Sequence, residues 1–286
     1  MQDLIPILAG ARDLPAPSKA AARLLELLNS NQSSVGEVTS SLEKAPALSA
    51  ALLQYVNSPQ YGLRNRVSSL SHAVCLLGFR TVRNIALTAS IAELFHRPAK
   101  SPCMNMSQFA AHTLASAVVA RRLSSYTGVG EPEQCYTLCL LHDVGKLVMD
   151  SCYPDDYLRA VTFARRTHQP TWMSERNTMG YDHAALGEAL ARLWKVPEDI
   201  VTAIGRHHDV QAAVETEMQL VAHVTEYVCW VKGYRCHDDF AAPELNEAAW
   251  YRLRLDAAAL THLLGALDVE IQHVCETFLP ARVKKA

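Results

Sequence analysis

The sequence has little net charge and no extended basic segment. Its 286 residues include 27 Lys and Arg against 29 Asp and Glu, a formal net charge of -2 at pH 7. Such a chain has no global positive field with which to hold nucleic acid by its phosphates. Its clustered arginines are typical of solvated helix faces, so we expect no nucleic-acid binding from them; they are Arg80, Arg83, Arg121, Arg122, Arg165 and Arg166.

Long hydrophobic runs and paired cysteines are also scarce. The purely apolar stretches, such as residues 138–141, fall far below the roughly 20 residues that cross a bilayer. Residues 1–6 have neither the positive segment nor the apolar region of a secretory signal. None of the eight cysteines forms a C-x-x-C pair, which indicates reduced thiols. These absences predict a soluble, cytoplasmic protein that does not bind a membrane.

Apolar residues spaced three and four apart, in contrast, are abundant, and sustained alternation is almost missing. This periodicity predicts an all-α fold. The spacing of Ser34 and Glu37 predicts a helix start, Pro46 suits a first helical turn, and Gly78 divides a long helix. The predicted helices span 20–28, 47–56, 71–95, 107–123, 133–149, 154–167, 182–194, 197–207 and 213–231, with two or three weaker ones between 243 and 279.

A proline-rich stretch at residues 97–102 divides the chain. It has two prolines and little apolar content, which is typical of a boundary. We therefore expect an N-terminal helical lobe over residues 1–103 and a second helical lobe over 104–232. Residues 233–286 are then a C-terminal helical extension.

The pair His142-Asp143 lies inside an otherwise apolar helical pattern, LLHDVGKL. Burying two polar side chains costs free energy unless they are paired or bind a metal ion. Neighbouring positions on a helix point about 100° apart, so a shared ion must lie between their two directions. Further ligands must then come from other helices.

Histidines on neighbouring predicted helices can supply those ligands: His112, His183, His207 and His208. Imidazole nitrogen together with carboxylate oxygen suits a divalent transition metal such as Fe, Mn, Ni or Zn. Lys146, one turn beyond His142, is a candidate phosphate contact. Metal-activated water and charge neutralisation would then allow phosphate-ester hydrolysis.

Each of these residues also has an explanation without a metal. A histidine such as His112 on an apolar face is often hydrogen-bonded to the backbone. The His207-His208 pair ends a helix, where the carbonyl dipole favours an imidazolium. Asp182 can cap the helix that carries His183, and Lys146 can be a solvated helix end. Cys135 and Cys139, one turn apart beside His142, allow a metal site, but small apolar filler is the favoured interpretation.

The residues around His142-Asp143 resemble the HD superfamily, a helical group known for metal-dependent phosphohydrolases. The whole chain is more similar to one branch, the HDOD (HD-related output domain) family of bacterial signalling proteins. The resemblance runs from about Leu14 to Val231 and includes segments 22–28, 46–53 (PALSAALL), 56–62 (VNSPQYG), 69–78 (SLSHAVCLLG), 140–147, 182–194 and 197–208. It implies an HD-type helical bundle joined to an N-terminal helical lobe.

Carried over residue by residue, the resemblance assigns the superfamily's ligands to His112, His142-Asp143, His183, and His207 or His208. The place of its final aspartate is taken by Thr225, whose neutral hydroxyl is a poor ligand for a divalent cation. Glu226 is adjacent, but its direction differs by about 100° on a helix, so its use as a substitute requires local rearrangement.

Two functions therefore compete. The HDOD-like pattern and Thr225 favour a regulatory signalling module that acts through a protein partner or a small phosphorylated ligand, without turnover. The histidines favour the alternative, a metal-dependent phosphohydrolase that acts on a nucleotide or another phosphate ester. Metal binding is compatible with both functions.

Overall fold

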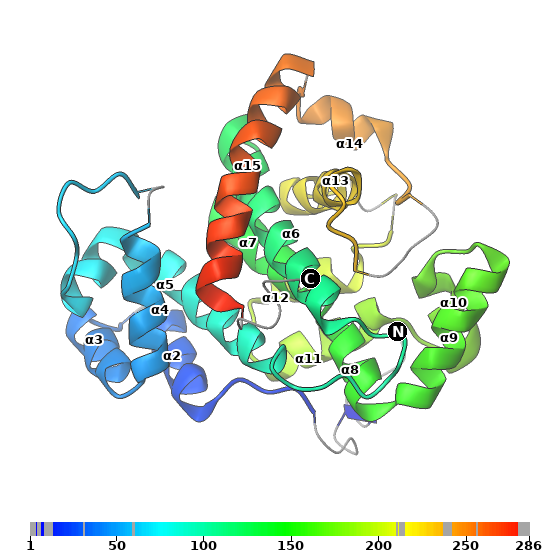
Figure 1. Cartoon of the computed structure of the whole chain (residues 1–286), viewed down its shortest axis with the longest axis horizontal. Helices are drawn as coiled ribbons and strands as arrows, with labels where there is room; N and C mark the ends of the chain where they lie inside the picture. Colours follow the sequence, from blue (N-terminus) through cyan, green and yellow to red (C-terminus); the bar gives the residue numbers. More distant parts are fainter. Residues whose placement is uncertain are drawn as a thin grey trace. The chain divides into compact units, whose positions relative to one another are not determined.

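The computed structural model describes residues 4, 7–8, 14–30, 32–58, 61–209, 211, 215–236, 242–255 and 257–279, and within these ranges all regular elements are helices (Figure 1). This confirms the all-α prediction. The helices are α2 (Lys19–Asn29), α3 (Val35–Glu43), α4 (Pro46–Val56), α5 (Leu70–Leu94), α6 (Met106–Thr127), α7 (Pro132–Leu141), α8 (Val144–Cys152), α9 (Pro154–Thr167), α10 (Thr171–Met179), α11 (His183–Leu193), α12 (Glu198–Gly205), α13 (Glu217–Val231), α14 (Glu247–Arg252) and α15 (Ala257–Phe278).

The chain forms two compact units, and each contains a segment from the opposite end of the sequence. One unit comprises Met1–Pro15 and Pro98–Leu267, and the other comprises Ala16–Arg97 and Asp268–Ala286. The division between them falls within α15. All the candidate site residues belong to the first unit.

In the second unit, α2, α3 and α4 pack against α5. The predicted start of α3 is confirmed, since Ser34 and Glu37 form a reciprocal capping box, and Pro46 is the first residue of α4. Gly78 kinks α5 with a φ of 74°, a conformation that glycine adopts easily. By length and composition α5 is apolar enough to cross a membrane, but half of its most apolar stretch is buried within the fold, as in a core helix.

In the first unit, α6 packs against α7 and α13, while α11 packs against α8 and α12. The contact between α8 and α11 is unusually close, because a Cβ added to Gly145 would lie 1.9 Å from the carbonyl oxygen of His183. Only glycine permits two backbones to approach in this way. The helices that carry the candidate histidines are thereby brought to one region.

The predicted continuous helix over 133–149 is wrong. It is broken between α7 and α8, where Asp143 has φ -98° and ψ 3°. The Nδ1–H of His142 donates to the carbonyl oxygen of Cys139 at 2.7 Å, and that oxygen would otherwise accept the next backbone hydrogen bond of the helix. His142 and Asp143 therefore lie at a helix junction, and their directions differ from those of neighbours within one helix.

Candidate metal centre

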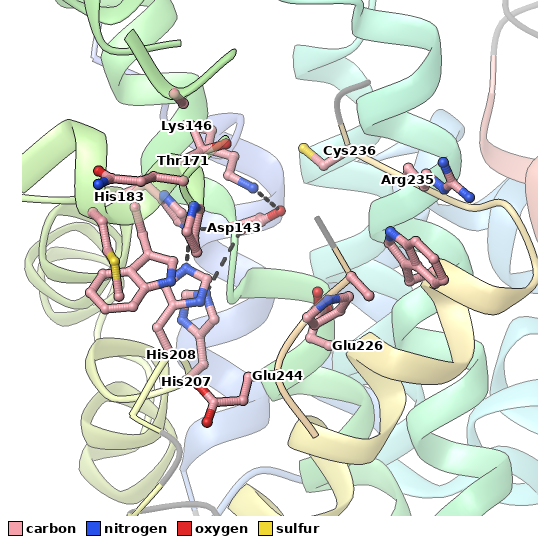
Figure 2. A pocket seen from close by; sticks show the side chains of 18 of the residues that line it. Asp143, Lys146, Thr171, His183, His207, His208, Glu226, Arg235, Cys236 and Glu244 are labelled. Atoms are coloured by element: carbon pink, nitrogen blue, oxygen red, sulfur yellow. Dashed lines mark hydrogen bonds and ion pairs between the residues drawn. The ribbon is translucent and has the colours of Figure 1, made fainter. Parts of the chain in front are cut away.

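The structure brings the predicted ligands together in one buried cluster. His112 comes from α6, His142 and Asp143 from the α7–α8 junction, His183 from the start of α11, and His207 and His208 from the residues after α12. Figure 2 shows His183, His207 and His208 beside Asp143. Side chains far apart in the sequence thus share one small volume.

Asp143 lies at the centre of the cluster, and its two oxygens face different histidines. Oδ2 lies 3.3 Å from Nε2 of His112 and 3.5 Å from Nε2 of His142. Oδ1 lies 3.1 Å from Nε2 of His183 and 3.9 Å from Nε2 of His207. The carboxylate therefore bridges two sets of imidazoles.

Lys146 is part of the cluster rather than a solvated helix end. Its side chain is 7% exposed, and Nζ donates to Oδ2 of Asp143 at 2.8 Å. Burial opposes charge on Asp143, but Lys146 and His142 outweigh it and hold the pKa of this carboxyl well below its ordinary value. Asp143 is therefore an anion at neutral pH.

Most of the ring orientations are fixed by a hydrogen bond at Nδ1. His112 donates to the carbonyl oxygen of Tyr234 at 3.0 Å, and His207 donates to that of Ile204 at 2.7 Å. Together with the bond from His142 to Cys139, these contacts place the Nε2 atoms toward the interior of the cluster. Hydrogen bonds of this kind orient the imidazole ligands of metal sites.

The inward-facing atoms are too close to be stable without a positive charge among them. Nε2 of His142 lies 3.2 Å from Nε2 of His112 and 3.0 Å from Oε1 of Glu226. Because the Nδ1 atoms of both rings already donate, neutral rings would direct lone pairs at one another. A proton or a metal ion in the cluster relieves this repulsion.

Glu226, not Thr225, places a second carboxylate beside the histidines, whereas the assignment of Thr225 to the position of the final aspartate stays a prediction from the resemblance. Both residues lie on the regular helix α13, and no local rearrangement is needed. Thr225 is fully buried, does not line the cavity, and its hydroxyl lies against the Cys139 thiol rather than the histidines. Burial opposes charge on Glu226, but His142 and His112 outweigh it and lower its pKa to about 2.

Three supporting residues could not be identified from the sequence. Glu175 on α10 is fully buried, and its Oε2 accepts from Nδ1 of His183 at 2.6 Å. The ring of Trp172 stacks on that of His208 with centroids 5.5 Å apart. His223, for which the sequence predicts no role, lines the adjoining cavity. The helix α10 itself was not predicted, because its sequence TWMSERNTM has no apolar stripe.

The pKa values of the histidines in the cluster are shifted in opposite directions. Burial lowers the pKa of His112 and His183, but Glu226 and Glu175 respectively outweigh it, so the pKa of His112 is raised and that of His183 is raised to about 9. Burial and the neighbouring His142 and His183 lower the pKa of His207 to about 3. The pKa of His208 is also well below its ordinary value, because of burial and then His207.

A cavity of about 180 Å³ opens beside the cluster. Asp143, Lys146 and Glu226 line it together with four of the histidines, His112, His183, His207 and His208. Figure 2 shows that Arg235, Cys236 and Glu244 also line it. Further lining residues are Arg165, His168, Trp172 and Trp230. A small molecule in this cavity would contact the cluster directly.

The donor set fits divalent transition-metal ions. Two groups of three ligand atoms each lie within 4.8 Å of one another: His112, His142 and Glu226 form the first ligand group, and His183, His207 and His208 form the second ligand group. Nε2 of His207 is buried with no hydrogen-bond partner, which is costly unless an ion satisfies it. Imidazole and carboxylate ligands suit Fe, Mn, Ni or Zn.

Cys135 and Cys139 are small buried residues of α7 and belong to neither ligand group. Burial raises the pKa of Cys135 to about 12 and that of Cys139 well above its ordinary value. Both are therefore thiols at neutral pH, as the interpretation as apolar filler requires.

Comparison with solved structures supports the fold. The chain is 26% identical to an HDOD domain protein of unknown function from Geobacter sulfurreducens, with a TM-score of 0.76 and coverage of 96% of this chain and 97% of that one. A protein from Shewanella amazonensis SB2B with the provisional name phosphohydrolase is 22% identical (TM-score 0.70, coverage 93% and 95%). A protein from Marinobacter aquaeolei VT8 with the provisional name signal transduction protein is 20% identical (TM-score 0.71, coverage 99% and 64%).

Sequence comparison adds a relative and a family. An uncharacterized protein of Treponema pallidum (strain Nichols) is 24% identical over 213 residues, which is 74% of this chain and 41% of that protein. This chain thus spans less than half the length of that curated relative. The HDOD domain family matches residues 14–210, more than half of the chain, and the chain belongs to the HDOD domain family.

Proposed function

We propose that this chain is a regulatory module of bacterial signal transduction that binds divalent transition-metal ions and a small phosphorylated ligand. The observation that carries the proposal is the close approach of Nε2 of His142 to Nε2 of His112 and Oε1 of Glu226, which calls for a cation. Membership of the HDOD family and the name of the Marinobacter protein support the signalling role. In this role the module acts in the cytoplasm on a protein partner, without nucleic acid or a membrane.

The residues of the cluster have distinct parts in this proposal. The first ligand group would hold one ion and the second ligand group would hold another, and the Asp143 carboxylate faces histidines of both groups. Bound ions would supply positive charge for a phosphate group and polarise its oxygens. Lys146, which lines the cavity, adds an ammonium group.

Metal loading tests the proposal. Protein stripped with a chelator and dialysed against Fe²⁺, Mn²⁺, Ni²⁺ or Zn²⁺ should retain about two ions per chain, measured by mass spectrometry of the elements. Binding of inorganic phosphate, measured by equilibrium dialysis, should require the loaded protein and weaken in Lys146→Met. A wild-type protein that retains no ion under any of these conditions would contradict the proposal.

Glu226 favours a second candidate, metal-dependent hydrolysis of a phosphate ester. The main objection to catalysis is that Thr225 offers no anionic ligand. Glu226 answers this objection, because its Oε1 lies 3.0 Å from Nε2 of His142. The name of the Shewanella protein is consistent with this chemistry. In such a reaction Asp143 and the histidines would orient the nucleophile, and Lys146 would contact the phosphate.

Hydrolysis is distinguished from binding by turnover. The metal-loaded protein should release nitrophenol from bis(4-nitrophenyl) phosphate if it is an enzyme, and the activity should disappear in both His142→Ala and Asp143→Ala. Activity that survives these substitutions comes from a contaminant. Phosphate binding without release of nitrophenol supports the regulatory role.

A further inference from the structure

One face of α10 supports the second ligand group. Trp172, Glu175 and Arg176 occupy positions i, i+3 and i+4 of this helix, which place side chains on the same side. We propose that Glu175 is a positioning residue, which fixes the ring of His183 so that the second ligand group can hold an ion independently of the first. This inference rests on the proposed metal binding and adds to it the residue that controls one half of the site.

Glu175 holds His183 by two hydrogen bonds to a single oxygen. Its Oε2 accepts from the backbone N–H of His183 at 2.8 Å and from Nδ1–H of the same residue at 2.6 Å. The carboxyl group is fully buried, and its other oxygen, Oε1, has no hydrogen-bond partner. Because burial of a carboxylate is costly, this arrangement indicates that Glu175 serves His183 rather than general stability.

The orientation that Glu175 imposes has a direct effect inside the cluster. With Nδ1 engaged, Nε2 of His183 lies 3.1 Å from Oδ1 of Asp143 and 2.7 Å from Nε2 of His208. Without Glu175, the ring could rotate or carry its single proton on Nε2, and it would then present no lone pair to an ion. The carboxylate therefore determines whether His183 is a ligand.

The other two residues of this face reinforce the same half of the site. Trp172 stacks on His208 with an interplanar angle of 14°. The guanidinium of Arg176 lies 4.9 Å from the centre of the Trp172 ring, and its Nε is 2.7 Å from Oδ2 of Asp182. Asp182 caps α11, the helix that begins with His183. These contacts involve either a residue of the second ligand group or the cap of the helix that carries His183.

The first ligand group does not depend on α10. Its two histidines donate from Nδ1 to the backbone carbonyl oxygens of Tyr234 and Cys139, which belong to the segment after α13 and to α7. A substitution at position 175 should consequently weaken one ion-binding group and spare the other.

A spectroscopic test needs no metal. The short hydrogen bond to Glu175 should give the Nδ1–H proton of His183 a strongly deshielded, slowly exchanging NMR signal that correlates with ring nitrogen. The signal should be present in the metal-free wild type and lost in His183→Gln and in Glu175→Met, which has a similar volume but no acceptor. If the histidine ring signals of Glu175→Met are the same as those of the wild type, the inference is overturned.

A binding test uses Co²⁺, whose absorption reports its coordination. We expect two Co²⁺ per chain in the wild type and one in Glu175→Met. The isosteric Glu175→Gln keeps an acceptor but loses the charge, and its weaker site should bind ten- to a hundred-fold less tightly, the range typical of residues that orient metal ligands. If Glu175→Met is not folded, Glu175→Gln alone decides the test.

Two further variants make the result specific. Glu226→Gln should weaken the first ion and leave the deshielded His183 proton in place. Glu188→Gln changes a mostly buried glutamate of α11 that pairs with Arg192 and belongs to neither ligand group, and it should keep both ions. Two tightly bound Co²⁺ in Glu175→Gln overturn the inference, whereas a wild type without Co²⁺ contradicts the proposed function and leaves the NMR result to judge Glu175.

Discussion

The two ligand groups use similar side chains but are supported by different parts of the chain. In the first, His112 and His142 donate to backbone carbonyl oxygens, and Glu226 projects from a regular helix. In the second, His183 donates to a buried carboxylate and His208 stacks on an indole ring. A carbonyl oxygen belongs to every residue type, whereas a carboxylate or an indole is lost by a single substitution.

This difference separates the parts of the site that the fold guarantees from the parts that particular side chains supply. The first group should persist wherever α6, α7 and α13 pack together. The second depends on two side chains of α10, a short helix with a weakly apolar sequence. Substitutions that act on both groups, on one group or on neither then test the comparison.

Replacement of Asp143 should have the largest effect, because its two oxygens face both groups. Asp143→Asn should abolish retention of both ions. It also removes the carboxylate that pairs with the buried Lys146 ammonium, which should lower the free energy of unfolding by about 4 kcal/mol. Elemental analysis and urea denaturation measure the two effects. Retention of one ion in Asp143→Asn would show that the groups are independent of the bridge.

Gly145→Ala should affect the two ligand groups to different extents, because it forces two helices apart. The new Cβ would lie 1.9 Å from the carbonyl oxygen of His183, so α8 and α11 must shift, at a cost of about 3 kcal/mol of stability. The affinity of the second ligand group for its ion should fall more than the affinity of the first. Gly36→Ala is the matched control, because its Cβ meets only Ser34 Oγ at 3.9 Å, and thermal unfolding should show it unharmed.

The pH dependence of stability should distinguish the groups in the metal-free protein. The pKa of His183 is raised from 6.5 to about 9, so its contribution is complete below pH 6.5 and is lost as the pH rises toward 9. His183 should account for a fall of about 3 kcal/mol in the free energy of unfolding over this range, and His183→Gln should reduce the slope to the part that comes from His112, whose pKa is also raised.

The first group responds at the other end of the scale. The pKa of Glu226 is lowered from 4.5 to about 2, so its contribution is present above pH 4.5 and is lost as the pH falls toward 2. Urea denaturation at closely spaced pH values would reveal both limbs. An alkaline slope that His183→Gln leaves unchanged would contradict the assignment to the second group.

Thr225→Val should have the smallest effect and leave both groups intact. The substitution removes a fully buried hydroxyl whose polar neighbour is the weakly hydrogen-bonding Cys139 thiol, so stability should change by at most about 1 kcal/mol. Metal content should not change. Thr225→Asp, in contrast, should destabilise the protein, because a carboxylate would be buried away from the cluster.

The sequence predicts the helical class and most of the first unit because apolar spacing records which faces are buried. The start of α9 at Pro154 and the cap at Asp182 follow from local chemistry that is visible in the sequence. The convergence of His112, His142, Asp143, His183, His207 and His208 was predicted from the resemblance and from the improbability of burying His142 and Asp143 without partners. The role of these residues as metal ligands stays a prediction.

Other features could not be predicted for identifiable reasons. The break at His142 depends on a side chain that takes the carbonyl oxygen of Cys139, a competition that periodicity does not detect. The choice between Thr225 and Glu226 is a matter of one position on α13, and only packing fixes which of the two faces the cluster. Glu175 lies in a polar segment with no motif. Only the structure reveals its hydrogen bond to His183.

The position of α13 has a practical consequence for dissecting this protein. The family match ends at residue 210, whereas Glu226 lies on Glu217–Val231 and the carbonyl oxygen that holds His112 belongs to Tyr234. A fragment trimmed to the match would retain the second ligand group. It would lack the Glu226 carboxylate and the carbonyl oxygen that anchors the His112 ring. Functional fragments of this chain should therefore extend past residue 236, and a shorter one that fails to bind would say nothing about the intact module.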